Sequence, residues 1–227
     1  MALNKAHTSV WVKVMIIILI VAFVSLFMYG GVVGVFDLFN QPAQTQTATQ
    51  TPAEALAAIN AKHQPAIDAL KPPAESKPAS YTAIVTLANA YFDWAQELST
   101  PAANQSQPTT TAIEAAIQTW TLARAEYDKA AKLDAKDPSV QTDRAVAMFY
   151  SNDTTAAVVT IQKTIAASPT FAAAWLNAGV FYEALGKNEQ AVLAYRKYVA
   201  IDPKGQNVAY ANSRVAELTG TGSATTK

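Results

Sequence analysis

The sequence contains no cysteine, which excludes a disulfide framework, a thiol nucleophile and a zinc site with cysteine ligands. It contains only two histidines, His7 and His63, and neither has a second histidine near it in the sequence. We therefore expect no metal site and no catalytic histidine pair. We interpret His63 as a solvated surface residue.

An excess of charge of one sign is also absent, because 17 lysines and arginines balance 17 aspartates and glutamates. Proteins that bind nucleic acid through its phosphates need a concentrated excess of positive charge, so we expect no nucleic acid partner. The sequence also lacks the motifs of phosphate-binding loops, serine hydrolase elbows and zinc protease helices. We predict that the protein is not an enzyme and binds no cofactor.

One long apolar segment is present. Val14–Phe36 comprises 23 residues without a charge, and a helix of that length spans about 35 Å, enough to cross a bilayer. A cleavable secretory signal is the alternative, but its apolar stretch is usually shorter. We predict a transmembrane helix over 14–36. Gly30 and Gly34 have the small-residue spacing that allows two membrane helices to dimerise.

The lysines around this segment predict its orientation. Lys5 and Lys13 precede it, and no lysine or arginine follows until Lys62, which favours an N-terminus inside the cell. We therefore predict a single-pass membrane protein with a cytoplasmic segment at 1–13. The rest of the chain, residues 37–227, would then lie outside the cytoplasm.

A polar linker and a helix follow the apolar segment. Residues 37–51 are rich in glutamine and threonine and show no apolar periodicity, so we predict a flexible tether. Thr51-Pro52-Ala53-Glu54 is typical of a helix start, with a capping threonine, a proline in the first turn and a glutamate three residues after the cap. We predict a leading helix over 52–70, kinked at Pro65. Its apolar face is formed by Leu56, Ile59, Ile67 and Leu70.

Residues near the C-terminus recur with a period of 34. The pairs separated by this interval are Ala145 and Gly179, Ala157 and Ala191, and Pro169 and Pro203. Small residues at the first two kinds of position allow two antiparallel helices to cross closely, and the proline stops the second helix. The period therefore predicts a stack of helical hairpins.

The segment from Ala172 to Gly205 resembles a tetratricopeptide repeat, through Trp175, Gly179, Tyr182, Ala191, Tyr195 and Pro203. Tyr198 departs from the pattern, because the family usually has alanine there. The resemblance implies an all-α solenoid of about three repeats with a capping helix. We place repeat 1 at 81–137 with an insertion of 23 residues, repeat 2 at 138–171, repeat 3 at 172–205, the capping helix at 206–218 and a disordered tail at 219–227.

Tetratricopeptide proteins bind peptides or partner proteins in a groove lined by the first helix of each repeat, so the resemblance implies a docking scaffold near a membrane. The implied groove residues are Val85, Asn89, Phe92 and Asp93 in repeat 1, Thr142, Val146, Phe149 and Tyr150 in repeat 2, and Leu176, Val180, Glu183 and Ala184 in repeat 3. This lining is apolar and aromatic with two carboxylates, which suits an apolar segment of a partner. No groove position is basic, which disfavours a ligand held by its C-terminal carboxylate.

Three alternatives stay open at this point. The leading helix 52–70 has an apolar face that must be buried, so it could fill the groove and turn Phe92, Phe149 and Tyr150 into core residues. The protein could be a self-associating structural protein without a separate client. It could also be a cleaved export product, with a mature N-terminus beyond Gly34.

Overall fold

The structure, a computed structural model, describes residues 51–100 and 107–220, and all regular secondary structure in these ranges is α-helical. The helices are α2 (Pro52–Ala74), α3 (Tyr81–Leu98), α4 (Thr110–Leu133), α5 (Pro138–Tyr150), α6 (Thr154–Ala167), α7 (Ala172–Ala184), α8 (Asn188–Ile201) and α9 (Val208–Leu218). The predicted cytoplasmic segment, the transmembrane helix with Gly30 and Gly34, the tether up to residue 50 and the tail from residue 221 lie outside the described residues. Within those residues no helix is both long and apolar enough to cross a membrane.

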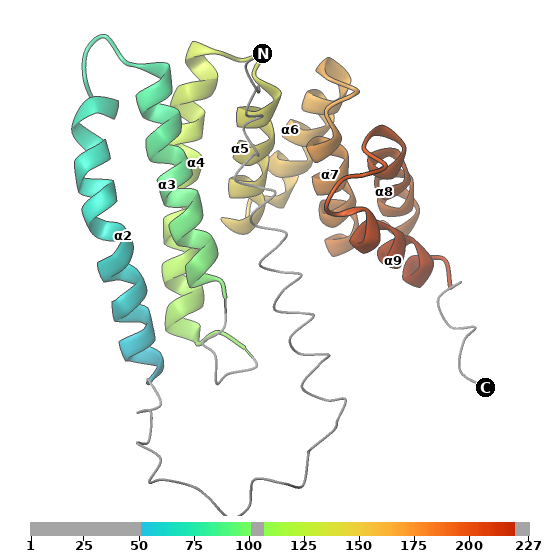
Figure 1. Cartoon of the computed structure of the whole chain (residues 1–227), viewed down its shortest axis with the longest axis horizontal. Coiled ribbons are helices and arrows are strands. Elements are labelled where there is room, and N and C mark those ends of the chain that lie inside the picture. Colours follow the sequence, from blue (N-terminus) through green and yellow to red (C-terminus); the bar gives the residue numbers. More distant parts are fainter. Residues whose placement is uncertain (1–50, 101–106, 221–227) are drawn as a thin grey trace, which may run out of the picture.

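The helices form a row of antiparallel hairpins that follow one another through the molecule (Figure 1). The hairpins are α3–α4, α5–α6 and α7–α8, and α5 and α7 each also pack on the second helix of the preceding hairpin. The first helices α5 and α7 touch each other directly, and α9 packs on α8 at the end of the row. This arrangement is an α-solenoid, as the 34-residue period predicts.

The periodic residues form the crossing points inside each hairpin. Ala123, Ala157 and Ala191 are completely buried, as are the larger side chains one helical turn further on, Tyr127, Ile161 and Tyr195. In the third hairpin, a Cβ added to Gly179 would lie 2.5 Å from Tyr195 Cε1. Only glycine therefore permits α7 to approach α8 this closely.

The leading helix α2 starts as predicted from its capping motif and ends later than predicted. Glu54 accepts a hydrogen bond from the Thr51 N–H at 2.7 Å, and Thr51 Oγ1 accepts one from the Glu54 N–H at 3.3 Å. The expected end at residue 70 is wrong, because α2 continues to Ala74 with three prolines inside it. The burial of Ala74 and the hydrogen bond from the Glu75 N–H to the Lys71 carbonyl stabilise the additional turn.

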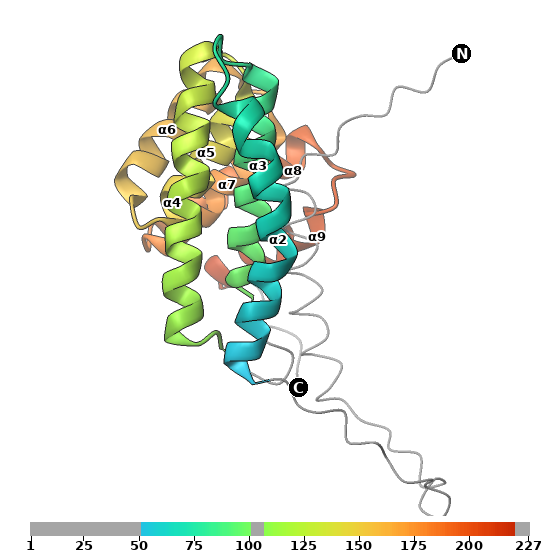
Figure 2. The ribbon, with the colours of Figure 1, turned by 90° about the vertical axis from the view of Figure 1, so that its left-hand side faces the viewer.

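Helix α2 packs along α3, as Figure 2 shows with α2, α3 and α4 towards the viewer. The His63 ring stacks on Trp94 with centroids 6.0 Å apart, and His63 Nε2 lies 2.7 Å from Glu97 Oε2. The interpretation of His63 as a solvated residue is therefore wrong, because Trp94 and Glu97 cover it and leave its side chain 15% exposed. Burial raises the pKa of Glu97, but hydrogen bonds from Lys62 and His63 outweigh burial and lower it overall.

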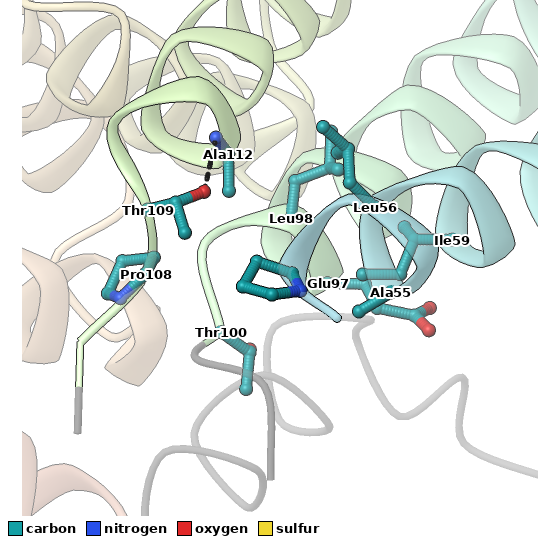
Figure 3. A pocket seen from close by; sticks show the side chains of 10 residues that line it. Ala55, Leu56, Ile59, Glu97, Leu98, Thr100, Pro108, Thr109 and Ala112 are labelled. Carbon is teal, nitrogen blue, oxygen red and sulfur yellow. Dashed lines mark hydrogen bonds between the residues drawn. The ribbon is translucent and has the colours of Figure 1, made fainter. Parts of the chain in front are cut away.

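The insertion in the first repeat lengthens one end of the α3–α4 hairpin, which extends beyond α5 in Figure 1. Helix α4 begins at Thr110, with the Thr109 hydroxyl accepting a hydrogen bond from the Ala112 N–H. Figure 3 shows a pocket of about 220 Å³ at this end, between the start of α2, the end of α3 and the start of α4. Its apolar lining includes Leu56, Ile59, Leu98, Pro108 and Ala112.

Candidate partner-binding groove

The twelve predicted groove residues lie on α3, α5 and α7, the first helices of the three hairpins. We call the surface that they define the groove face. Helix α2 buries its apolar side against α3, where Trp94 Nε1 donates a hydrogen bond to Asn60 Oδ1 at 3.1 Å. Helix α2 therefore forms an additional layer at the end of the row, with its apolar face packed on α3.

On α3, the structure separates the four predicted residues by burial. Phe92 is 1% exposed, and its ring meets Trp120 of α4 edge-on with centroids 4.7 Å apart. This ring belongs to the core of the first hairpin. Val85 and Asn89 are half-buried, and Asp93 is exposed.

On α5, the aromatic residues connect neighbouring hairpins. Tyr150 stacks on Trp120 with centroids 5.0 Å apart, and Phe149 stacks on Phe181 of α7 at 4.5 Å. Phe149 and Tyr150 are half-buried, whereas Thr142 and Val146 are buried. Sequence reasoning missed Trp120 and Phe181, although both are large aromatic residues on helices that the repeat pattern already predicts.

These rings also line a recess beside the groove face. It has a volume of about 350 Å³ and lies where the extended start of α4 passes the end of α5. Its apolar wall is formed by Ile113, Ile117, Trp120, Phe149 and Tyr150. The insertion thus adds a second apolar surface next to two predicted groove residues.

On α7, the predicted carboxylate Glu183 is already engaged. Arg214 of the capping helix α9 donates to both of its oxygens, with Arg214 Nε 3.1 Å from Glu183 Oε2. The Tyr195 hydroxyl donates to the same oxygen at 3.0 Å. Leu176 is buried, Val180 is half-buried and Ala184 is exposed. The expected free carboxylate at this end of the groove is therefore an internal ion pair.

Asp143, a carboxylate that the sequence led us to attribute to helix capping and solubility, lies on α5 beside Thr142. Its residue is 6% exposed, and no described residue forms a hydrogen bond or ion pair with it. Burial, together with the nearby carboxylates of Asp137 and Asp93, raises its pKa to about 8. The signal in the sequence was the 34-residue period, which pairs Asp143 with Asn177 of the third hairpin.

The hydroxyl groups around this carboxylate are used elsewhere. Tyr127 donates to Asn89 Oδ1 at 2.6 Å, and Tyr81 donates to Asp137 Oδ2 at 2.8 Å. Asp137 also caps α5, where it accepts from the Ser139 N–H at 2.8 Å. The junction of α3, α4 and α5 is therefore acidic. The Tyr127 and Tyr81 hydroxyls and the Ser139 N–H all donate to acceptors other than Asp143.

No group of three or more histidine, aspartate or glutamate side chains in residues 51–100 and 107–220 could hold a metal ion. What the groove face offers is a set of apolar and aromatic surfaces from consecutive hairpins, with the Asp143 carboxylate among them.

Comparison with known proteins supports the fold. No family model matches the sequence, and no curated protein matches it in a sequence search. Solved structures do match. A crystal structure of MamA has 20% identity and a TM-score of 0.54 over 73% of this chain and 82% of that one. A thermophilic tetratricopeptide repeat protein of Thermus thermophilus has 15% identity and a TM-score of 0.53, over 75% of this chain and 82% of that one.

A tetratricopeptide repeat protein from Parabacteroides merdae is also similar, with 14% identity and a TM-score of 0.50, over 74% of this chain and 61% of that one. At such low identities these likenesses show the fold alone. The described part of the chain is an α-solenoid of the tetratricopeptide type.

Proposed function

We propose that this protein is a docking module whose groove face binds a segment of a partner protein. The observation that carries the proposal is that consecutive first helices each carry half-buried apolar or aromatic residues at groove positions: Val85, Phe149, Tyr150 and Val180. Half-buried apolar and aromatic side chains on a rigid helical frame suit the binding of an extended or helical apolar segment. Function would then consist of binding, without catalysis.

The proposal includes a membrane tether. Its support is the sequence: the uncharged segment Val14–Phe36, the preceding Lys5 and Lys13, and the polar linker that leads to the start of α2. The groove face would then work outside the cytoplasm, within reach of the membrane surface. Pairing of two copies through Gly30 and Gly34 belongs to the same proposal.

Two measurements on the full chain test the tether. The protein should stay in the membrane pellet after extraction with alkaline carbonate, and protease added from the extracytoplasmic side should reach the solenoid domain. Recovery in the carbonate supernatant, or a mature N-terminus beyond Gly34, would refute the anchor and favour a cleaved export product.

Site-specific photocrosslinking tests the groove face. We would place benzoylphenylalanine at Val180 in the full chain, in its native membranes, with Leu193 as the control position. Leu193 lies on the second helix α8 and is 62% exposed, so a random encounter labels it more readily than Val180. We expect one discrete adduct from Val180 that is missing from Leu193.

A groove variant completes this experiment. Ala184→Arg should abolish the Val180 adduct, because Ala184 is exposed on α7 and the added charge would occupy the groove face without disturbing the core. Phe92 is unsuitable for the purpose, since it is a core residue. Adducts of the protein with itself alone would favour the self-associating alternative. The absence of any Val180 adduct would refute the docking site.

A further inference from the structure

We propose that the partner segment carries a lysine or arginine whose side chain pairs with Asp143 in the groove face. This inference rests on the proposed docking function and names the chemistry of the partner. It depends on three observations: the burial of Asp143, the charges around it and the residue at the equivalent place in the next hairpin.

Burial without a partner is the first observation. The residue is 94% buried and receives no hydrogen bond or ion pair from the described residues, although neither of its carboxyl oxygens is among the fully enclosed unpaired atoms. A buried carboxyl group without partners lowers the stability of a folded protein, because it loses its hydration and gains nothing in exchange. A ligand that supplies a positive charge and N–H donors would satisfy it.

The sign of the surrounding charge is the second observation. The groups that act on Asp143 are Asp137 on its own helix and Asp93 on α3, and both disfavour its ionised form. Burial raises the pKa of Tyr127 on α4, and the nearby carboxyl groups of Asp143 and Asp93 raise it as well. Three carboxylates from two helices therefore converge on one region, and no described cation acts on Asp143. The local field favours a cation and repels an anion.

The equivalent residue in the next hairpin is the third observation. Asn177 lies 34 residues after Asp143 and is buried to a similar degree, at 2% exposed. Its Nδ2 donates a hydrogen bond to the Ala173 carbonyl at 2.9 Å, four residues earlier in α7. Asp143 makes no such bond with the described residues, and after losing its proton it could not donate one. An asparagine at position 143 could donate a hydrogen bond within its own helix, as Asn177 does. The presence of an aspartate instead favours a role for this carboxylate in binding a ligand.

The neighbouring side chains indicate what flanks the cation. Val146 lies close to one turn after Asp143 on α5, and Phe149 follows close to one turn later, stacked on α7. Val146 is itself buried, so half-buried Phe149 is the residue that suits an apolar position of the partner on one side of its lysine or arginine. On the other side, exposed Asp93 adds negative charge at the rim of the groove face.

Peptide selection tests the proposal on the full chain in detergent. The probe is a phage-displayed library of random 12-residue peptides, selected in parallel on the wild type, on Asp143→Asn and on the control Asp68→Asn. Asp68 is exposed on α2, away from the groove face. We expect the wild type and the control to select apolar peptides with a lysine or arginine at one fixed position. Asp143→Asn should keep the apolar preference and lose the basic one.

A binding measurement on one selected peptide makes the test quantitative. Replacing its basic residue by norleucine should weaken binding to the wild type about 10- to 100-fold and leave binding to Asp143→Asn nearly unchanged. Because a bound cation lowers the pKa of Asp143, binding at pH 7 should release a proton. Calorimetry in phosphate and Tris buffers should then give different apparent enthalpies for the wild type and equal ones for Asp143→Asn.

The outcomes separate this inference from the proposed function. Selection of apolar peptides without a basic position, or an equal norleucine effect in Asp143→Asn, overturns the cation site and leaves the docking function intact. Failure of every variant to select peptides overturns both. Circular dichroism of Asp143→Asn verifies that the fold is retained, as the asparagine at position 177 leads us to expect.

Discussion

Replacement of Gly179 by alanine is the sharpest test of the helix crossing, because two effects of opposite sign compete at this residue. An alanine in a helix interior is favoured over glycine by about 1 kcal/mol. Against this, the new Cβ would lie 2.5 Å from Tyr195 Cε1 and 2.6 Å from Cδ1, whereas carbon atoms in contact are about 3.5–4.0 Å apart. The ring must therefore move by about 1 Å.

Tyr195 has little freedom to make that movement. It is completely buried, and its hydroxyl donates to Glu183 at 3.0 Å, so displacement disturbs both the core and a hydrogen bond. Overpacking of this kind costs about 1–3 kcal/mol, and the buried hydrogen bond contributes about 1 kcal/mol more. After subtraction of the helix preference, we expect Gly179→Ala to lower the free energy of unfolding by about 1–3 kcal/mol.

Urea unfolding of the full chain, followed by circular dichroism at pH 7, measures this change. A double-mutant cycle with Tyr195→Leu supplies the control, because the smaller side chain removes the ring atoms that meet the new Cβ. Gly179→Ala should cost less in the Tyr195→Leu background than in the wild type. Equal or higher stability of the single variant would refute the close crossing of α7 and α8.

Three further outcomes follow from the described contacts. The pKa of Asp143 is higher in the folded protein than in an unfolded chain, so Asp143 destabilises the fold progressively as the pH rises from 4 towards 8. Thermal unfolding should therefore show Asp143→Asn to be more stable than the wild type by about 1–3 kcal/mol at pH 9 and by little at pH 4. Arg214→Ala removes the hydrogen bonds that tie α9 to Glu183, and faster amide hydrogen exchange confined to α9 should result, whereas unchanged protection would contradict this role. Phe92→Ser should lower the free energy of unfolding by about 3–5 kcal/mol, as urea unfolding can verify.

The residues that the sequence identifies most clearly are those whose role depends on spacing. Small side chains at 145, 157, 179 and 191 mark helix crossings wherever the 34-residue period is present, because a close crossing admits no larger residue. The cap at Thr51 likewise follows from local chemistry, since its hydrogen bonds reach only three residues along the chain. The end of α2 does not follow from local chemistry, because the burial of Ala74 stabilises the last turn in spite of the prolines in it.

The candidate site depends on contacts between helices that are far apart in the sequence. Phe92 occupies a groove position of the repeat, yet Trp120, from the helix that the insertion extends, draws its ring into the core. Glu183 also occupies a groove position, but Arg214 lies 31 residues later and neutralises it from the capping helix. The period predicts helices but indicates neither contact, because each contact joins side chains that are far apart in the sequence.

The sequence by itself thus determined the helical class, the period and the helices that form the groove face, because close crossings and caps require particular residues at fixed spacing. Only the tertiary structure decided which groove residues have side chains accessible at the surface, that α2 packs on α3, and that Asp143 is buried near other carboxyl groups. Burial and charge are properties of a neighbourhood, and the neighbours of Asp143 come from helices almost fifty residues apart, brought together by the fold.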